Sequence, residues 1–159
     1  GKASSSYQLS ALKKYISPDL FCEINFIVLS GEPPDLGINF RFLPFTEENE
    51  KLFFQLVHIG IVPSTESLFD AGKTPVKALQ HFSYGATVLS NPHGAGAEFI
   101  SKDTGFIYRN DFEEQVALIL GNRNLAKEKA MNGYALHSQV YCSQVVAGML
   151  VQSLKSLRE

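Results

Sequence analysis

The sequence predicts an α/β fold: a doubly wound parallel sheet covered by helices on both faces, which makes a three-layer Rossmann-like domain. Two observations predict it. Five short apolar runs stop at Gly, Pro or polar residues, as strands buried on both faces do. Segments with helical spacing of apolar residues separate these runs, the pattern of repeated βαβ units. With 159 residues, 45% of them hydrophobic, residues 1–159 fit a single domain.

Each expected strand is followed by residues that are unfavourable in a β-strand. The first ends at Gly31-Glu32-Pro33-Pro34, where proline has no N–H to donate to a neighbouring strand. In chain order the expected strands are Glu23–Ser30, Ile38–Leu43, Val57–Val62, Ala86–Ser90 and Gly105–Tyr108.

Helices are expected between and after the strands. Thr46 is a good N-cap, and acidic residues follow it in the first turn. Asp111 and Glu114 have the Asp-x-x-Glu spacing of a capping box. The expected helices are Ser6–Tyr15, Thr46–Leu56, a helix that starts at Thr74, Asp111–Leu120 and the segment from Asn124 onward, with kinks at Gly133 and Gly148.

Charge and cysteine content argue against several classes of protein. The 14 Lys and Arg residues nearly balance the 16 Asp and Glu residues, for a net charge of −2, so the basic surface that nucleic acid requires is not expected. No apolar run is long enough to predict a membrane span, and no signal peptide is expected. Cys22 and Cys142 lie in no Cys/His cluster and are expected to be reduced, which predicts a cytoplasmic protein. The four histidines are scattered, so no metal site is expected.

The first residues, Gly1–Ser6, have the composition of a loop between a strand and a helix, although no strand precedes them. Two explanations stay open at this point. The sequence is a fragment that starts just after its first strand, or these residues are foreign to the natural chain.

The segment Gly94-Ala95-Gly96-Ala97-Glu98-Phe99 is similar to a dinucleotide-binding fingerprint, because it follows a predicted strand. Phe99 replaces the third glycine, and no acidic residue follows at the distance that would hold a ribose. A nicotinamide or flavin cofactor is therefore not expected. The segment is either an ordinary loop or a turn whose amides approach an anion.

The helix that starts at Thr74 carries the most informative pattern. Thr74 suits an N-cap, Pro75 the first helical position and Gly85 a left-handed C-terminal cap. Free amides at Gly72–Thr74 together with Lys73 and Lys77 form a predicted phosphate site. The helical spacing divides the segment into an expected buried side, made of Val76, Ala78, Leu79 and Phe82, and a polar side made of Lys77, Gln80, His81 and Tyr84. Gln80 and Tyr84 are placed to meet a ribose or base; the alternative is a solvated polar face.

Several motifs together resemble a known family. In order they are Gly31-Glu32-Pro33-Pro34, Phe42-Leu43-Pro44-Phe45, Ile59-Gly60-Ile61-Val62-Pro63-Ser64, Lys73-Thr74-Pro75-Val76-Lys77-Ala78-Leu79-Gln80, Gly85-Ala86-Thr87-Val88-Leu89-Ser90, Glu98-Phe99-Ile100 and Gly105-Phe106-Ile107-Tyr108. This series resembles the C-terminal domain of retaining glycosyltransferases of the group 1 type, which have two Rossmann-like domains in a GT-B fold. The resemblance covers nearly the whole chain.

The resemblance implies a function. In that family this domain binds the nucleotide diphosphate sugar, and a separate N-terminal domain, missing from this sequence, binds the acceptor. The full enzyme transfers the glycosyl group to an acceptor hydroxyl. The isolated domain is therefore expected to be inactive.

The resemblance also implies roles for individual residues. The family's Glu-x7-Glu motif falls on Gly72 and Gln80, so neither glutamate is present. Gln80 is left to contact the ribose through its amide oxygen. Lys73 and Lys77 are expected to stabilise the leaving diphosphate, with the Gly72 and Thr74 amides as donors and no metal ion.

Further contacts are implied at three other places. Lys2 corresponds to the family's basic residue after its first strand. Gly94, Gly96 and Glu98 are expected to line the sugar. Two alternatives remain: a degenerate, non-catalytic interaction domain, favoured by the two lost glutamates, and half of a sugar-nucleotide epimerase, in which Glu98 is the one carboxylate placed for acid–base chemistry.

Overall fold

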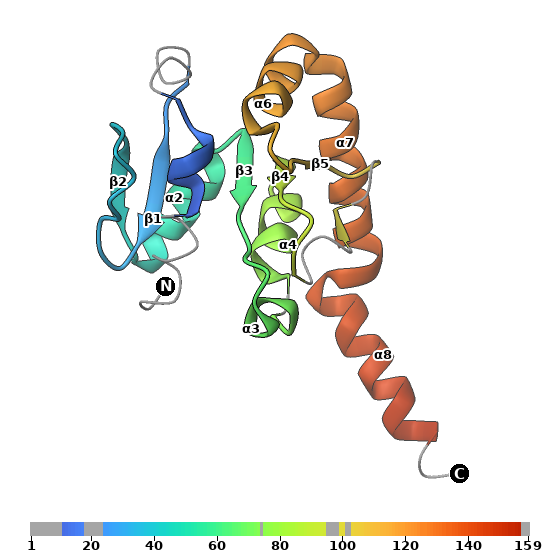
Figure 1. Cartoon of the computed structure of the whole chain (residues 1–159). Helices are drawn as coiled ribbons and strands as arrows, with labels where there is room; N and C mark the ends of the chain where they lie inside the picture. The colour runs from blue at the N-terminus through green and yellow to red at the C-terminus, as the bar shows by residue number, and fades with distance from the viewer. Residues whose placement is uncertain (1–10, 18–23, 74, 95–98, 101–102, 157–159) are drawn as a thin grey trace.

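A computed structural model describes residues 11–17, 24–73, 75–94, 99–100 and 103–156 of the chain. Parallel strands form the centre of the molecule, and helices lie on both sides of them (Figure 1). The predicted doubly wound α/β class is confirmed.

All five predicted strands are present, each shorter than its apolar run. They are β1 (Ile27–Ser30), β2 (Arg41–Pro44), β3 (Ile59–Val62), β4 (Thr87–Ser90) and β5 (Phe106–Ile107). Every pairing is parallel, but the strands form two sheets, β1-β2 and β3-β4-β5, where the sequence suggested one. The division falls between β1 and β3, which lie side by side without pairing (Figure 1).

The predicted helices occur in the predicted order, and the structure adds one short helix after β3 that was not predicted. The helices are the 3-10 helix η1 (Ala11–Tyr15), α2 (Glu47–Leu56), α3 (Leu68–Ala71), α4 (Val76–Ser83), α6 (Phe112–Gly121), α7 (Arg123–Leu136), the π-helix η3 (His137–Tyr141) and α8 (Ser143–Ser156). The start of the helix expected at Ser6–Tyr15 lies outside the described residues.

The predicted N-cap of α2 is confirmed, whereas the capping box of α6 is wrong. The Thr46 hydroxyl accepts a hydrogen bond from the Asn49 N–H at 3.1 Å. At α6, the Asp111 carboxylate instead accepts from the backbone N–H of Arg109 at 2.7 Å and from the Gln115 side-chain amide at 2.8 Å. Both carboxylate oxygens of Asp111 are thus engaged by other groups, and the side chain makes no cap bond to the backbone amides of the first turn.

The C-terminal helices break at Cys142, not at the predicted glycines. Cys142 is extended, with φ −68° and ψ 153°, directly after the π-helix. Gly133 and Gly148 both lie inside α-helices. Gly133 is needed for close packing, since a Cβ there would lie 2.4 Å from Cδ1 of Phe82.

Two apolar clusters pack against opposite faces of the β3-β4-β5 sheet. One contains Leu12, Leu89, Phe106, Phe112, Val116 and Ile119, and so joins η1 and α6 to the sheet. The other contains Val62, Ala78, Phe82, Val88 and Ile100, and so joins α4 to the opposite face.

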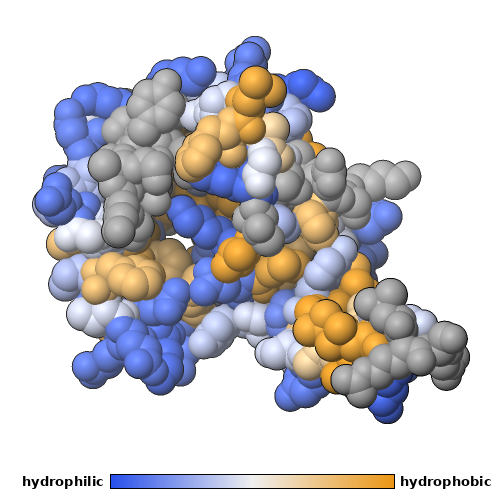
Figure 2. Space-filling view, turned by 90° about the horizontal axis from the view of Figure 1, so that it is seen from below, coloured by the Kyte–Doolittle hydropathy of each residue, from blue (hydrophilic) through white to orange (hydrophobic). Residues whose placement is uncertain are grey.

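Helix α8 projects away from this core (Figure 1) and has no buried residue. Its exposed apolar side chains are Val146, Met149, Leu150, Val151 and Leu154, and hydrophobic side chains gather at this end of the molecule in Figure 2. Within the described part of the chain, no helix combines the length and apolar character that crossing a membrane would require.

Candidate functional site

The chain reverses its direction of winding between β1 and β3. It moves outward from β1 to β2, crosses back through α2 to β3, and then moves outward the other way to β4 and β5. In open α/β sheets, ligands bind at this switch point, beyond the carboxyl ends of the strands. Figure 2 looks onto that edge and shows a hollow in the surface.

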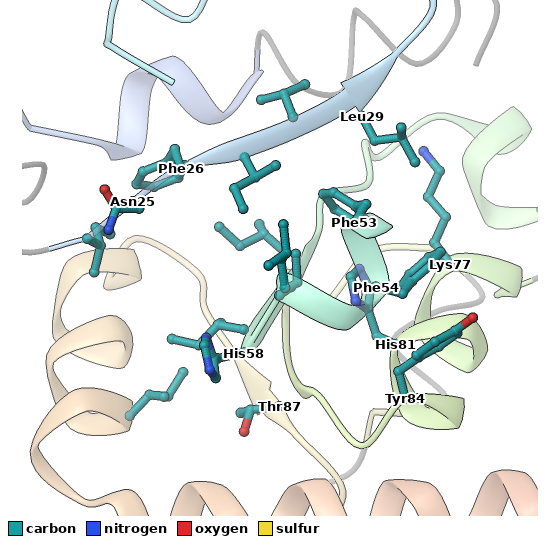
Figure 3. Close-up of a pocket in the computed structure, with 18 of the residues that line it drawn as sticks. Asn25, Phe26, Leu29, Phe53, Phe54, His58, Lys77, His81, Tyr84 and Thr87 are labelled. Atoms are coloured by element: carbon teal, nitrogen blue, oxygen red, sulfur yellow. The ribbon is translucent and has the colours of Figure 1, made fainter. Parts of the chain in front are cut away.

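A cavity of about 2460 Å³ opens between the two sheets. It is lined by β1 and β3 and by residues of α2 and α4 (Figure 3). Three of the predicted site residues, Lys77, Gln80 and Tyr84, line it.

A buried carboxylate organises the loop after β3. Asp70 is only 4% exposed and accepts hydrogen bonds from the Thr65 N–H at 2.7 Å and the Thr65 hydroxyl at 2.6 Å. The Lys73 ammonium lies 2.7 Å from its other carboxylate oxygen and 4.5 Å from the centre of the Phe69 ring. The positive charge of Lys73 is thus compensated within the loop.

The loops after β3 and β4 are joined by an amide side chain. Asn91 accepts from the Ser64 N–H at 3.0 Å and donates to the Ser64 carbonyl. Gly94 follows with φ +73°, and a Cβ there would lie 3.0 Å from the Asp70 carbonyl oxygen, so glycine is required for this approach. Gly94 therefore lies beside the Asp70 loop.

Helix α4 begins next to this cluster. Its first backbone bond runs from the Leu79 N–H to the Pro75 carbonyl at 3.0 Å, so the amides of Val76 and Lys77 have no acceptor within the helix. The Gly72 amide, by contrast, already donates to the Leu68 carbonyl at 3.2 Å. Thr74, the predicted N-cap, lies outside the described residues, and the helix is preceded directly by Pro75, which makes no side-chain cap bond.

Lys77 differs from Lys73 in having no carboxylate in ion-pair contact among the described residues. Its side chain extends from α4 toward Leu29 of β1 (Figure 3). Although part of the side chain is exposed, neighbouring protein desolvates the ammonium, and this burial lowers the pKa of Lys77. Repulsion by Lys73 lowers that pKa further, whereas Asp70 acts in the opposite direction.

The predicted division of α4 into a buried and a polar side is partly wrong. Ala78 and Phe82 are fully buried, as expected, but Val76 is half exposed and His81 is only 5% exposed. His81 is buried because α2 packs against this side of α4: the Phe54 ring lies 5.0 Å from the imidazole, edge to face. Gly60 makes room for the ring, since a Cβ there would lie 2.3 Å from its Cγ.

Gln80 and Tyr84 of the α4 region also contact α2. The Gln80 amide donates to the Glu50 carboxylate of α2 at 3.1 Å. The Tyr84 ring stacks on Phe54, with centroids 5.2 Å apart and an interplanar angle of 18°. Both side chains therefore contact α2, although Tyr84 remains 49% exposed; Figure 3 shows Phe54 and Tyr84 close together.

The structure brings the predicted residues Lys73, Lys77 and Gly94 to the carboxyl edge of the strands, and sets Gln80 and Tyr84 behind them against α2. Lys2, Thr74, Gly96 and Glu98 lie outside the described residues. Sequence reasoning missed Asp70 and Asn91. Ser67, a helix-capping residue three positions before Asp70, was an available signal: its hydroxyl accepts from the Asp70 N–H at 3.2 Å.

Comparisons with known proteins support the fold. No protein-family model and no curated protein matches the sequence. The C-terminal domain of the group 1 glycosyltransferase LpcC from Francisella tularensis matches with a TM-score of 0.51 and 21% identity over 69% of this chain and 56% of that one. HepE from Anabaena, in complex with UDP-glucose, matches with a TM-score of 0.67 and 14% identity over 98% of this chain and 45% of that one.

HepE with UDP and glucose gives a similar result, with a TM-score of 0.65 and 16% identity over 94% of this chain and 46% of that one. The chain thus spans about half the length of the structures it matches. These likenesses confirm the predicted resemblance at the level of the fold: the chain folds like one Rossmann-like half of a GT-B glycosyltransferase.

Proposed function

We propose that this chain is the donor-binding domain of a retaining glycosyltransferase, which holds a nucleotide diphosphate sugar while its glycosyl group moves to an acceptor hydroxyl. The uncompensated ammonium of Lys77 carries the proposal. It lies in the first turn of α4, beside amides without helical acceptors, at the edge where α/β sheets bind ligands. The solved structures that share the fold include complexes with UDP and UDP-glucose.

The diphosphate is assigned to the start of α4. Lys77 and Lys73 supply positive charge, and the backbone amides of Gly72 and Thr74 are assigned as donors. Gly72 would first have to release the Leu68 carbonyl. Negative charge that builds on the leaving diphosphate would be stabilised there without a metal ion.

The nucleoside is assigned to the cavity side of α4. Gln80 would exchange its bond with Glu50 for a ribose hydroxyl, and Tyr84 offers a ring face to the base. The loop Gly94–Gly96 with Glu98 is assigned to the sugar, and Lys2 to the phosphates.

A second domain completes the enzyme in this proposal. The HepE structures are about twice as long as this chain, and the exposed apolar residues of α8 offer a surface for further polypeptide. We assign the acceptor to that domain, expect the isolated chain to transfer no sugar, and place the enzyme in the cytoplasm.

Titration of the isotope-labelled chain with UDP, followed by NMR, tests the assignment. Shifts are expected around Lys73, Lys77 and Gly94. Removing one partly buried helix-end charge, as in Lys77→Ala, should weaken binding by roughly threefold to thirtyfold. Lys51→Ala is the matched control, because it removes the same charge from α2, where Lys51 pairs with Glu47 at 2.8 Å.

If both variants bind UDP equally weakly, the affinity depends only on the net charge of the chain, and the assignment of the diphosphate to the start of α4 is contradicted. Shifts confined to other surfaces would contradict it as well. Absence of any UDP binding would favour the alternative of a non-catalytic interaction domain, which the glycine at position 72 and the Gln80–Glu50 bond also favour.

A further inference from the structure

One buried carboxylate serves two lysines near the start of α4. The Lys73 ammonium lies 2.7 Å from Oδ1 of Asp70. The Lys77 ammonium is attracted by the same carboxylate and repelled by Lys73. Two positive charges therefore share one negative charge, and the three side chains together keep an excess of positive charge.

The Asp70 carboxylate is held in place without help from Lys73. Its Oδ2 accepts hydrogen bonds from the Thr65 N–H at 2.7 Å and from the Thr65 hydroxyl at 2.6 Å. The Asp70 N–H donates to the Ser67 hydroxyl at 3.2 Å, and its carbonyl oxygen lies where a Cβ on Gly94 would come within 3.0 Å. Asp70 is therefore fixed by the loops after β3 and β4, and the carboxylate stays where it is when its partner moves.

Lys73 is the movable member of the pair. Its side chain is 35% exposed, whereas that of Asp70 is 4% exposed. The ammonium lies 4.5 Å from the centre of the Phe69 ring, which is itself 68% exposed. A lysine carries its charge on a flexible stem with several rotatable bonds. Rotation of the side chain alone is enough to exchange the Asp70 oxygen for another anion.

We propose that the Asp70–Lys73 ion pair is an inhibitory contact of the diphosphate site: a bound diphosphate draws Lys73 away from Asp70, so that Asp70 sets the affinity of the site. This inference rests on the proposed function, since it takes the start of α4 as the place of the diphosphate. In the free chain, Lys77 is the uncompensated cation of the two. In the bound state, phosphate oxygens pair with both ammonium groups and relieve their mutual repulsion.

The exchange has an electrostatic cost at Asp70. The carboxylate keeps both hydrogen bonds from Thr65 but loses its counter-ion, and a buried charge without its partner is unfavourable. This cost is subtracted from the binding free energy of the diphosphate. Removing the Asp70 charge should therefore strengthen binding, although Asp70 is a buried residue of the site.

Binding of inorganic pyrophosphate to the 159-residue chain, followed by NMR, tests this contact. Asp70→Asn keeps an oxygen acceptor for Thr65 and places an amide nitrogen opposite Lys73, which releases the ammonium. We expect the variant to bind pyrophosphate roughly threefold to thirtyfold more tightly, the range for a charge at a helix end. If Asp70 had only a structural role, its replacement would weaken binding instead.

Glu66→Gln is the matched control. It removes a carboxylate from the same loop, but Glu66 is 84% exposed and lies 3.4 Å from Nε2 of His93, not beside Lys73. The affinity should change by no more than about twofold, as is usual for an exposed charge. A second comparison repeats Asp70→Asn in a Lys73→Met background, which removes the ammonium and keeps a side chain of similar length. The gain in affinity should shrink there by roughly threefold or more, because no lysine is left to release.

Several results would overturn the proposal. One is an affinity of Asp70→Asn equal to or below that of the parent chain. The others are an equal gain from Glu66→Gln, and an undiminished gain in the Lys73→Met background. If Asp70→Asn fails to fold, the parent chain with isotope-labelled lysines decides during the titration. Side-chain signals of Lys73 that shift together with those of Lys77 support the exchange, and shifts of Lys77 alone overturn it.

Lys77→Ala separates this proposal from the proposed function. If it weakens pyrophosphate binding while Asp70→Asn leaves the affinity unchanged, the inhibitory contact is wrong and the diphosphate site stands. If Lys77→Ala binds as tightly as the parent chain, the site itself is wrong, whatever the result for Asp70. Absence of pyrophosphate binding by all of these chains contradicts both.

Discussion

Acidification from pH 7.5 to 5.0 is expected to destabilise the domain through His81. The imidazole is 5% exposed between α2 and β3, and its Nδ1 has no hydrogen-bond partner among the described residues. Burial, followed by the positive charge of Lys77, lowers the pKa of His81 from 6.5 to about 4. The ring therefore stays neutral in the folded state at a pH where the unfolded chain binds a proton.

The magnitude follows from this difference in pKa. Between pH 6.5 and 4 the unfolded state holds more protons, so the free energy of unfolding falls as the pH falls. At ~1.36 kcal/mol per pKa unit, the drop from pH 7.5 to 5.0 costs about 2 kcal/mol. With a urea dependence of ~1–3 kcal/mol/M, the midpoint of unfolding should shift down by roughly 0.7–2 M.

Urea unfolding at the two pH values, followed by far-UV circular dichroism because the chain has no tryptophan, measures this shift. His81→Leu should lose most of the pH dependence, whereas the control His58→Leu removes an exposed histidine and should keep it. The carboxyl groups with lowered pKa, Asp35, Asp111 and Glu113, are stabilising above their ordinary pKa and lose that contribution only at still lower pH. A His81→Leu variant with the full acid shift would refute the reasoning.

Two further predictions concern packing and capping. Gly133→Ala should lower the free energy of unfolding by ~1–3 kcal/mol relative to Gly148→Ala, because its Cβ meets the buried Phe82 ring while a Cβ at Gly148 meets open space; equal urea midpoints for the two variants would contradict this. Thr46→Ala should cost about 1 kcal/mol, because the Asn49 N–H loses its acceptor; thermal unfolding measures the change, and an unaltered midpoint would show that the cap contributes nothing.

Local patterns in the sequence predicted most of the fold. Each strand was marked by its own apolar run and stop residues, so its presence did not depend on distant contacts. The same holds for the Thr46 cap and for Gly85, whose φ of +68° confirms the predicted left-handed cap. The boundaries were less accurate: the first strand was expected from Glu23, whereas pairing starts at Ile27.

Features that depend on contacts between elements were not predicted. His81 was placed on a polar face because its sequence neighbours are polar, but Phe54 of α2 and the space left by Gly60 bury it. The role of Asp70 was missed because it depends on Thr65 and Lys73 meeting around one carboxylate. The division into two sheets was missed because an apolar run does not specify which strand lies beside it.

The two lysines at the start of α4 illustrate how such contacts change a functional interpretation. In the sequence, Lys73 and Lys77 are equivalent cations near a helix N-terminus. In the structure, Asp70 neutralises Lys73, while the same Lys73 repels Lys77 and no carboxylate contacts Lys77 in the described part of the chain. An anion bound at this edge would gain more from Lys77, since that charge is desolvated and still uncompensated.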